Sequence, residues 1–471
     1  MGEPVGVGPH PGNTDTARKL EILCRQAGRA IRWNTALARK WIAGQGETEL
    51  IFYTDGHVRV YRGDLTPLPR HYVARERLCL RGTTDYWINA MDGQPFFFVN
   101  KEVDPGLLAT RRDDLVPWLE TNAPASAELP QRMQEDSLQH RFTLVFDREG
   151  YSPEFFREMK QRRIAILSYH KFAGEDWPVE EFSTCRVPLA GGEVTAMKLS
   201  ERGSRLSNGL WVREVRKLSE TGRQTSLLST NYRADYTALA VSMFARWSQE
   251  NFYKYMRQNY NLDRLAEYGT EPVPDTIQAV NPAWRKLDAQ IRAKTETRRR
   301  HLALFGALDL QSSLAEPEVA RYQQKKAQLQ EEIENLNREI DELKKQRKQT
   351  PHHIAAKDLP ESDRFSRLLT ERKHFIDTIK LIAYRAETSM ASLLRDKLNR
   401  EDDTRALLRQ IYETEIDLVP DLETNTLTVR LHHLTQAAHD EAPRHLCNEL
   451  NATETLFPGT DLKLVYQLGS S

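Results

Sequence analysis

The sequence has few cysteines and no long apolar run. Its four cysteines, Cys24, Cys79, Cys185 and Cys447, are scattered along 471 residues without a C-x-x-C pair. This spacing argues against a zinc ribbon or a disulfide scaffold and fits a reducing compartment. No apolar stretch approaches the ~18 residues that a membrane span needs, and the opening residues lack the basic and apolar parts of a signal peptide. We therefore expect a cytoplasmic protein without a membrane partner.

The chain also lacks net charge and an ATP-binding loop. Its 67 Lys and Arg residues balance 67 Asp and Glu residues, so the formal net charge is +0. A neutral chain does not predict a nucleic-acid-binding protein, and any contact with DNA must come from local basic patches. No Gly-rich loop is followed by Lys and then Ser or Thr, which argues against ATP dependence.

Periodicity and composition divide the chain into segments of different character. Residues 46–170 alternate between short apolar runs that end in turns and amphipathic helices, which predicts an α/β fold with a mixed, helix-covered sheet. Gly-rich turns separate strand-like pieces over 171–231, and this pattern predicts a β-rich insertion. In chain order we expect a disordered segment over 1–16, a basic helix over 17–45, the α/β core over 46–170 and 232–262, the insertion over 171–231, a basic linker and helix over 263–300, a helical region over 301–416 and an α/β segment over 417–471.

Two local features of the C-terminal half bear on partners. Residues 284–300 carry 7 Lys and Arg against 2 Asp and Glu and end in Arg298, Arg299 and Arg300. This segment predicts contacts with the DNA backbone, and a solvated helix face is an equal alternative. Apolar residues recur at spacings of three and four over about 319–346, which is the pattern of a coiled coil. The coiled coil predicts self-association, with an intramolecular helical hairpin as the alternative.

Three acidic residues stand in settings that favour chemistry. Asp55 and Asp147 each follow an apolar run that predicts a buried strand, and Glu250 lies inside a helix predicted from about Asp235 to Gln258. Two strand-end carboxylates and one helix carboxylate can converge at one edge of a sheet. Carboxylates are oxygen ligands that suit Mg²⁺, and a pair of such ions can activate water and stabilise the leaving oxygen in phosphodiester cleavage.

Each acid also has a structural interpretation that needs no catalysis. Asp55 precedes a glycine, and Asp before Gly is a common turn pattern. Glu250 can pair with Arg246 or Lys254 in a surface salt bridge worth only ~0.3–0.5 kcal/mol. Asp92 is a second choice for the first acid, but its own Asp-Gly pair predicts a hairpin turn.

The combination resembles the DDE transposases of bacterial insertion sequences. In members with a Tyr-x-x-Arg-x-x-x-Glu-x-x-x-x-x-x-Lys signature, the Glu is the last catalytic acid. The four signature positions are occupied here by Met243, Arg246, Glu250 and Arg257. Met therefore replaces the Tyr of the signature and Arg replaces the Lys. The resemblance covers about 46–262 and extends less specifically over the helical C-terminal part.

The resemblance implies a fold, a cofactor and roles for the acids. The fold would be an RNase H-like mixed sheet flanked by helices, with the β-rich insertion placed before the helix that bears the Glu. The cofactor would be Mg²⁺, with Mn²⁺ as a substitute. Asp55 would bridge two metal ions, and Asp147 and Glu250 would each hold one of them.

The resemblance also implies contacts with DNA. Arg246 and Arg257 would grip phosphates near the scissile bond, and Trp247 would stack on an unpaired base. An aromatic side chain packed against the sheet is the alternative for Trp247. The full set of expected DNA contacts is Arg246, Trp247, Lys254, Arg257, Arg298, Arg299 and Arg300.

Two functions remain open at this point. The first is a nucleoid-associated transposase that cuts double-stranded DNA at the ends of an insertion element and joins the freed 3′-hydroxyl to target DNA. Two element ends call for two protomers, so we expect a homodimer in the active complex. The second is a truncated or degenerate copy that binds DNA or partner subunits without cutting. Only one basic helix precedes the core, where such transposases usually carry a separate end-recognition domain.

Overall fold

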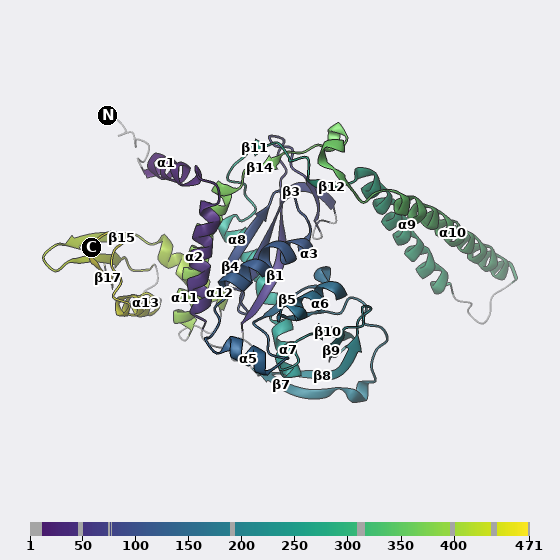
Figure 1. The fold of residues 1–471 in the computed structure, drawn as a ribbon, viewed down its shortest axis with the longest axis horizontal. Helices are drawn as coiled ribbons and strands as arrows, with labels where there is room; N and C mark the ends of the chain where they lie inside the picture. Colours follow the sequence, from purple (N-terminus) through teal and green to yellow (C-terminus); the bar gives the residue numbers. More distant parts are fainter. Residues whose placement is uncertain are drawn as a thin grey trace.

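A ten-stranded mixed sheet forms the centre of the molecule (Figure 1). The computed structural model describes residues 12–45, 50–73, 76, 78–188, 194–308, 316–395, 401–434 and 440–469. Helices cover the sheet, a pair of long helices projects from one side as an arm, and a small C-terminal α/β unit lies on the opposite side (Figure 1). The expected mixed α/β architecture is therefore confirmed.

The first half of the sheet combines antiparallel and parallel strands. Strands β1 (Ile51–Val60), β3 (Leu78–Asn89) and β4 (Pro95–Lys101) pair in antiparallel fashion in the order β4-β3-β1. Strands β5 (Thr143–Phe146) and β6 (Ala165–Tyr169) then continue the sheet parallel to β1. The short β2 (Arg70–Val73) pairs with the outer part of β3.

The second half of the sheet comes from the segment predicted as an insertion. Strand β10 (Gln224–Ser229) pairs antiparallel with β6, followed by β9 (Trp211–Leu218), β8 (Val194–Arg205) and β7 (Ser183–Pro188). The β-rich segment thus extends the central sheet by edge pairing.

The strands at the centre of the sheet bury both of their faces. Successive strand side chains point to opposite faces, so Phe52 and Leu144 pack in one core cluster and Tyr53 and Val145 in another. The first cluster is covered by α2 (Arg29–Ala43), the π-helix Arg111–Leu115, α4 (Val116–Asn122) and α6 (Pro153–Gln161), and the second by α7 (Tyr236–Phe244). Short helices α3 (Leu107–Thr110) and α5 (Leu129–Glu135) lie in the connections.

Two helices predicted as continuous are each broken in the structure. The N-terminal helix is split into α1 (Gly12–Cys24) and α2 by Gly28, whose φ of 76° ends the helical path. Because α1 begins at Gly12, the expected disorder is wrong for residues 12–16, and residues 1–11 lie outside the described part. The helix expected to carry Glu250 is divided into α7 and α8 (Trp247–Tyr260) at Arg246, where the backbone N–H donates to the Met243 carbonyl at 3.3 Å, an i→i−3 bond that tightens the turn.

The arm is an antiparallel hairpin of α9 (Pro282–Ala307) and α10 (Glu316–Gln349), visible in Figure 1. Lys294 Nζ lies 2.6 Å from Glu339 Oε2, and Arg298 donates to Asn337 Oδ1 at 2.8 Å across the seam. The predicted coiled-coil segment lies in α10. Its heptad positions Leu329 and Ile340 are buried. The intramolecular hairpin is thus the arrangement that the structure adopts. Strands β12 (Gln278–Val280) and β13 (His353–Ala355) pair at its base.

Helix α11 (Glu371–Arg395) fastens the C-terminal region to the core. It contacts α2 and β4, and Asp377 accepts hydrogen bonds from Lys373 and from Arg59 of β1, each at 2.6 Å. All three charged side chains are buried. Charges removed from water in this way are costly unless paired, so this cluster fixes where α11 lies on the sheet.

The remaining elements are small. Strands β11 (Thr270–Glu271) and β14 (Arg367–Leu368) pair beside the core, and α12 (Glu401–Glu413) packs on α11. The C-terminal unit has strands β15 (Ile416–Asp421), β16 (Thr426–Leu431) and β17 (Lys463–Leu468), with α13 (Glu441–Ala452) packed on β17. Within the described ranges, no helix is both long and apolar enough to cross a membrane.

Candidate active site

The strand register brings Asp55 and Asp147 to the same level of the sheet. Strands β1 and β5 are parallel neighbours, and Tyr53 is the partner of Val145. Asp55 and Asp147 each follow two residues later, so both side chains point to the face that Tyr53 and Val145 share. Asp147 follows the end of β5 as predicted, whereas Asp55 lies inside β1, because β1 continues beyond it by pairing with β3.

Arg246 lies among the three predicted acids. Its Nη2 donates to Glu250 Oε1 at 2.7 Å, and its Nη1 lies 4.0 Å from Asp55 Oδ2. Burial alone would lower the pKa of Arg246, but the charges of Asp55, Asp147 and Glu250 more than offset it and raise the pKa. The structure therefore brings all three acids into the electrostatic reach of one guanidinium. The salt bridge between Arg246 and Glu250, which was the structural alternative for Glu250, is present. We call Asp55, Asp147, Glu250 and Arg246 together the acid cluster.

Solvent reaches each of the three carboxylates. The side chain of Asp55 is 26% exposed, that of Asp147 33% and that of Glu250 39%. Burial still raises the pKa of Asp55 to about 6, against the opposing charge of Arg246. Among the described residues, no three His, Cys, Asp or Glu side chains are grouped closely enough to hold a metal ion. In this arrangement the Arg246 cation balances the acidic charges.

Hydrogen bonds between the strands and the two helices set this arrangement. The Tyr53 hydroxyl donates to the Ser242 carbonyl of α7 at 2.6 Å, and the Tyr253 hydroxyl of α8 donates to the Asp55 carbonyl at 3.4 Å. At the start of α8, Gln249 Nε2 donates to Asn89 Oδ1 at 2.8 Å. The break at Arg246 thus lies between two helices that are each tied to the sheet.

Arg111 is a residue of the site that the sequence analysis missed. Its side chain is fully buried, and it donates from Nε to Thr54 Oγ1 at 2.8 Å and from Nη2 to the Thr54 carbonyl at 2.9 Å. The guanidinium also lies 4.0 Å from the centre of the Phe146 ring. Thr54 and Phe146 directly precede Asp55 and Asp147, so Arg111 holds together the two strands that carry the acids.

A signal for Arg111 was present in the sequence. Arg111, Leu115 and Leu119 recur every four residues, and all three are buried on one helix face. A cation at such a position must find partners inside the protein. Burial lowers the pKa of Arg111 to about 9, and the charges of Asp55 and Asp147 oppose this effect.

Comparison with known proteins assigns the chain to a family. A family model described as "Transposase protein" matches residues 1–470. The chain belongs to this transposase family. A search of curated proteins found no match. The transposase assignment rests on the whole chain, so it applies to the core, the arm and the C-terminal unit together.

Three further residues of the transposase lie with Glu250 along one face of α8. Trp247, Lys254 and Arg257 are placed three residues before, four after and seven after Glu250, positions that share a helix face. The Trp247 side chain is 60% exposed, so the alternative of an aromatic packed against the sheet is wrong. Lys254 is exposed, and Arg257 is half-buried. The opposite face of α8 buries Phe252 and Met256 in the core.

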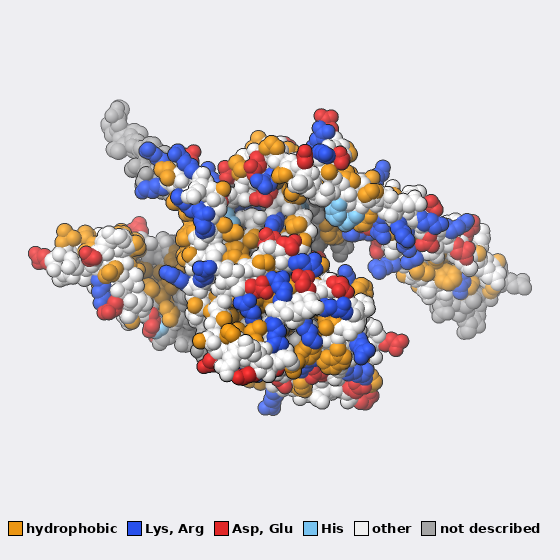
Figure 2. Space-filling model, in the orientation of Figure 1, with side chains coloured by type: hydrophobic (Ala, Val, Ile, Leu, Met, Phe, Trp, Pro, Cys, Tyr) orange, Lys and Arg blue, Asp and Glu red, His pale blue; other side chains and the backbone are white. Residues whose placement is uncertain are grey.

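The basic residues of the arm lie apart from the acids of the transposase. Arg298, Arg299 and Arg300 are on α9, and Figure 2 shows Lys and Arg side chains gathered along this helix. Arg299 and Arg300 are highly exposed and lie 4.0 and 3.9 Å from Glu296. Asp92, the second choice for the first acid, takes the turn role between β3 and β4, because its carboxylate accepts from the Gln94 backbone N–H at 3.0 Å.

Proposed function

We propose that this transposase cuts DNA at the ends of an insertion element and joins the freed 3′-hydroxyl to target DNA in one metal-dependent site. The observation that carries the proposal is that Arg246 pairs with Glu250, lies 4.0 Å from Asp55 and is within reach of the charge of Asp147. These acids come from a strand, the end of the neighbouring strand and a helix, and they are far apart in sequence. A purely structural role for each acid would not require all three to act on the charge of one guanidinium.

The fold supports the DDE class and an RNase H-like core. The resemblance implies a mixed, helix-covered sheet with a β-rich insertion before the helix of the last acid. The chain has antiparallel β4-β3-β1, parallel β5 and β6, and strands β7 to β10 directly before α7 and α8. Met243, at the position of the signature Tyr, lies in α7 and is fully buried in the core cluster that α7 covers. It therefore contributes packing there and no hydroxyl at the site.

The acids are of the ligand type that suits the Mg²⁺ or Mn²⁺ that the DDE class implies, and to hold an ion together they would have to move closer than they lie around Arg246. All three are partly exposed oxygen donors, which are the ligands that Mg²⁺ prefers. When bound, a pair of such ions activates the attacking water or hydroxyl and stabilises the leaving oxygen. Asp55, Asp147 and Glu250 are the residues that would hold these ions. Arg246 would then lose its acidic partners and become free to bind a phosphate of the DNA.

Basic side chains outside the acid cluster would contact the DNA. Lys254 and Arg257 extend from Glu250 along α8, and Trp247 offers an exposed ring at the start of the same face. Arg298, Arg299 and Arg300 on the arm would add contacts with phosphates at a distance from the acids. Phosphate contacts give affinity that depends on salt and not on sequence. Since transposition joins two element ends, we expect a homodimer in the complex with DNA.

A nicking assay on supercoiled DNA that carries the element ends tests this function. We expect nicking with Mg²⁺ or Mn²⁺, none in EDTA, and none for Asp55→Asn, Asp147→Asn or Glu250→Gln. Asp92→Asn is the matched control, because Asp92 is an exposed turn residue outside the acid cluster. Full activity in EDTA, or in the Asp147→Asn variant, would refute the proposal.

The second candidate function is a copy that binds DNA without cutting it. The replacement of the signature Tyr by the buried Met243 favours this candidate. It predicts that the wild-type chain binds DNA but makes no nick with either metal. Detection of a single round of nicking in Mn²⁺ would exclude it.

A further inference from the structure

Tyr169, the last residue of β6, brings a phenol ring to the acid cluster. Strands β5 and β6 are parallel neighbours, and Val145 is the partner of Leu167. Asp147 and Tyr169 each follow two residues later, so both side chains point to the sheet face that carries the acids. Neighbouring strands lie about 4.8 Å apart. Tyr169 is therefore the side chain that β6 places next to Asp147.

Two guanidinium groups lie beside the ring of Tyr169. The Cζ atoms of Arg148 and Arg246 are each 5.9 Å from the centre of the ring. Arg246 donates from Nη2 to Glu250, but its Nε is buried and has no hydrogen-bond partner among the described residues. Unpaired buried polar atoms are rare in folded proteins because each one costs free energy. An anion bound at this place would offer the missing acceptor.

The hydroxyl of Tyr169 is kept in its neutral, protonated form. Burial raises the pKa of Tyr169, and the charges of Asp147 and Glu250 raise it further against the opposing charge of Arg246. A protonated phenol can donate one hydrogen bond and accept others. Phosphate oxygens only accept hydrogen bonds, so a hydroxyl that stays protonated is a suitable donor to them.

Acceptors and donors lie side by side at this edge of the sheet. The three acids offer only oxygen atoms, which suit cations, whereas Tyr169, Arg148 and Arg246 offer O–H and N–H groups, which suit an anion. The side chain of Arg148 is 60% exposed, so solvent reaches the donors as well as the acids. A DNA phosphate held by metal ions at the acids would therefore meet the donors on its β6 side.

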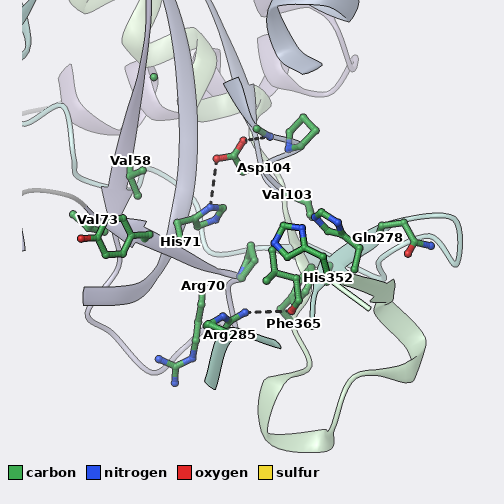
Figure 3. Close-up of a pocket in the computed structure, with 18 of the residues that line it drawn as sticks. Val58, Arg70, His71, Val73, Val103, Asp104, Gln278, Arg285, His352 and Phe365 are labelled. Carbon is green, nitrogen blue, oxygen red and sulfur yellow. Dashed lines mark hydrogen bonds and ion pairs between the residues drawn. The ribbon is translucent and has the colours of Figure 1, made fainter. Parts of the chain in front are cut away.

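A cavity of about 640 Å³ at the base of the arm is a separate feature (Figure 3). Gly56 and Val58 of β1 line it, and they point to the sheet face opposite to that of Asp55. Asp55, Asp147 and Glu250 are all absent from its wall. A phosphate bound at the acids would thus contact Tyr169 rather than the residues of this cavity.

We propose that Tyr169 is a DNA-contacting residue of the site, whose hydroxyl donates a hydrogen bond to an oxygen of the phosphate at which the strand is cut. Arg246 binds the same phosphate once metal ions have taken its acidic partners. The inference rests on the proposed function, because that function places a DNA phosphate at the acids. Removal of this one hydroxyl should weaken the contact with one phosphate and leave the other DNA contacts intact.

Ethylation interference tests this contact, because it identifies each phosphate that a protein needs for binding. Every molecule in a pool of end-bearing duplexes carries one ethylated phosphate, and the full chain binds the pool in Ca²⁺, which takes oxygen ligands as Mg²⁺ does. Tyr169→Phe keeps the ring and removes only the hydroxyl. We expect its affinity for the unmodified duplex to fall by about 10- to 150-fold, the range for one hydrogen bond to a charged group. Interference at one phosphate should weaken by the same factor.

Tyr236→Phe is the matched control. Tyr236 packs against the same core cluster as Tyr169, but its hydroxyl lies 3.2 Å from Cys185 Sγ of β7. This variant should bind the unmodified duplex like the wild type and give the wild-type interference pattern. A merely structural role of Tyr169 would weaken binding without changing the interference at one phosphate relative to the others.

Three results would overturn the proposal: a wild-type interference pattern in Tyr169→Phe, a local change at a phosphate other than the one that is nicked in Mg²⁺, or the same local change in Tyr236→Phe. If Tyr169→Phe shows the local change but the wild type makes no nick in Mg²⁺, the proposed function fails and the phosphate contact of Tyr169 stands. If the wild type nicks and Tyr169→Phe keeps both its rate and its interference pattern, the function stands and Tyr169 is not part of the site.

Discussion

The acid cluster and the helical arm place charged side chains by different means. In the cluster, strand register and buried hydrogen bonds hold Asp55, Asp147 and Arg111 where they are, so their positions are set by the core. On the arm, Arg299 and Arg300 project from a two-helix hairpin into solvent. Charges fixed by a core can act as ligands with defined geometry, whereas solvated charges contribute attraction at a distance. The comparison predicts that changes in the two regions affect different measurements.

The largest expected effect is the loss of DNA nicking when an acid is neutralised. Asp147→Asn should lower the nicking rate by at least about 10²–10³-fold, because metal ions contribute several kcal/mol to the stabilisation of the transition state. Its thermal unfolding should change little, since Asp147 is a partly exposed residue after the end of β5. Arg299→Ala should leave the nicking rate at saturating DNA unchanged. Equal losses of nicking in both variants would remove the distinction between the regions.

The second effect concerns stability. Arg111→Met should lower the free energy of unfolding by about 2–5 kcal/mol, because it removes the hydrogen bonds to Thr54 and leaves a poorly filled space beside Phe146. Arg112→Met is a matched neighbour whose partner Glu158 lies 2.7 Å away in a partly exposed pair, so its loss should cost at most ~1 kcal/mol. Urea denaturation of both variants measures the difference, and similar losses would show that Arg111 does not hold the strands.

The third prediction concerns pH. Burial raises the pKa of Asp55 from 3.8 to about 6. The folded state therefore binds more protons than the unfolded state between these values, and stability without metal falls as the pH rises through this window. Mg²⁺ requires the carboxylate, so its stabilising effect should be present above about pH 6 and should weaken about tenfold in affinity for each pH unit below.

Melting temperatures with and without Mg²⁺ between pH 5 and pH 8 measure this dependence. Asp55→Asn is the control, and its melting temperature should not respond to Mg²⁺ at any of these pH values. A rise in melting temperature with Mg²⁺ that is as large at pH 5 as at pH 8 would contradict the assignment of Asp55 as a metal ligand.

The sequence predicted the elements of the core better than the contacts within it. Apolar runs marked β1, β5 and β6, because buried strands leave local patterns. The turn expected at Asp55 and Gly56 is wrong, since β1 runs through both residues by pairing with β3. The contacts of Arg111 with Thr54 and Phe146 depend on which strands become neighbours, and no local pattern encodes that. The break at Arg246 was missed for the same reason, since the periodicity of a helix passes through it unchanged.

For the arm, the sequence predicted the helix pattern but not the helix that packs against it. Its heptad pattern was clear, but a heptad does not specify whether the partner helix belongs to the same chain or to a second copy. The partner is α9. Its many basic residues made the apolar positions that face α10 hard to recognise in the sequence. The cavity at its base, formed by residues from β1, β2, β12, α9 and the loops beside them, likewise had no counterpart in the sequence patterns.

The smallest expected effect is on the arm itself, and it tests the claim that these charges act at a distance. The double substitution Arg299→Ala and Arg300→Ala should weaken binding to duplex DNA and leave the unfolding free energy unchanged, because both side chains are exposed and their contacts with Glu296 are long. Each lost phosphate contact should reduce the slope of log K against log salt by about 0.9. A double variant with an unchanged slope would place the DNA elsewhere, whereas a slope reduced by about 1.8 would show that the arm follows the duplex while the core holds the bond to be cut.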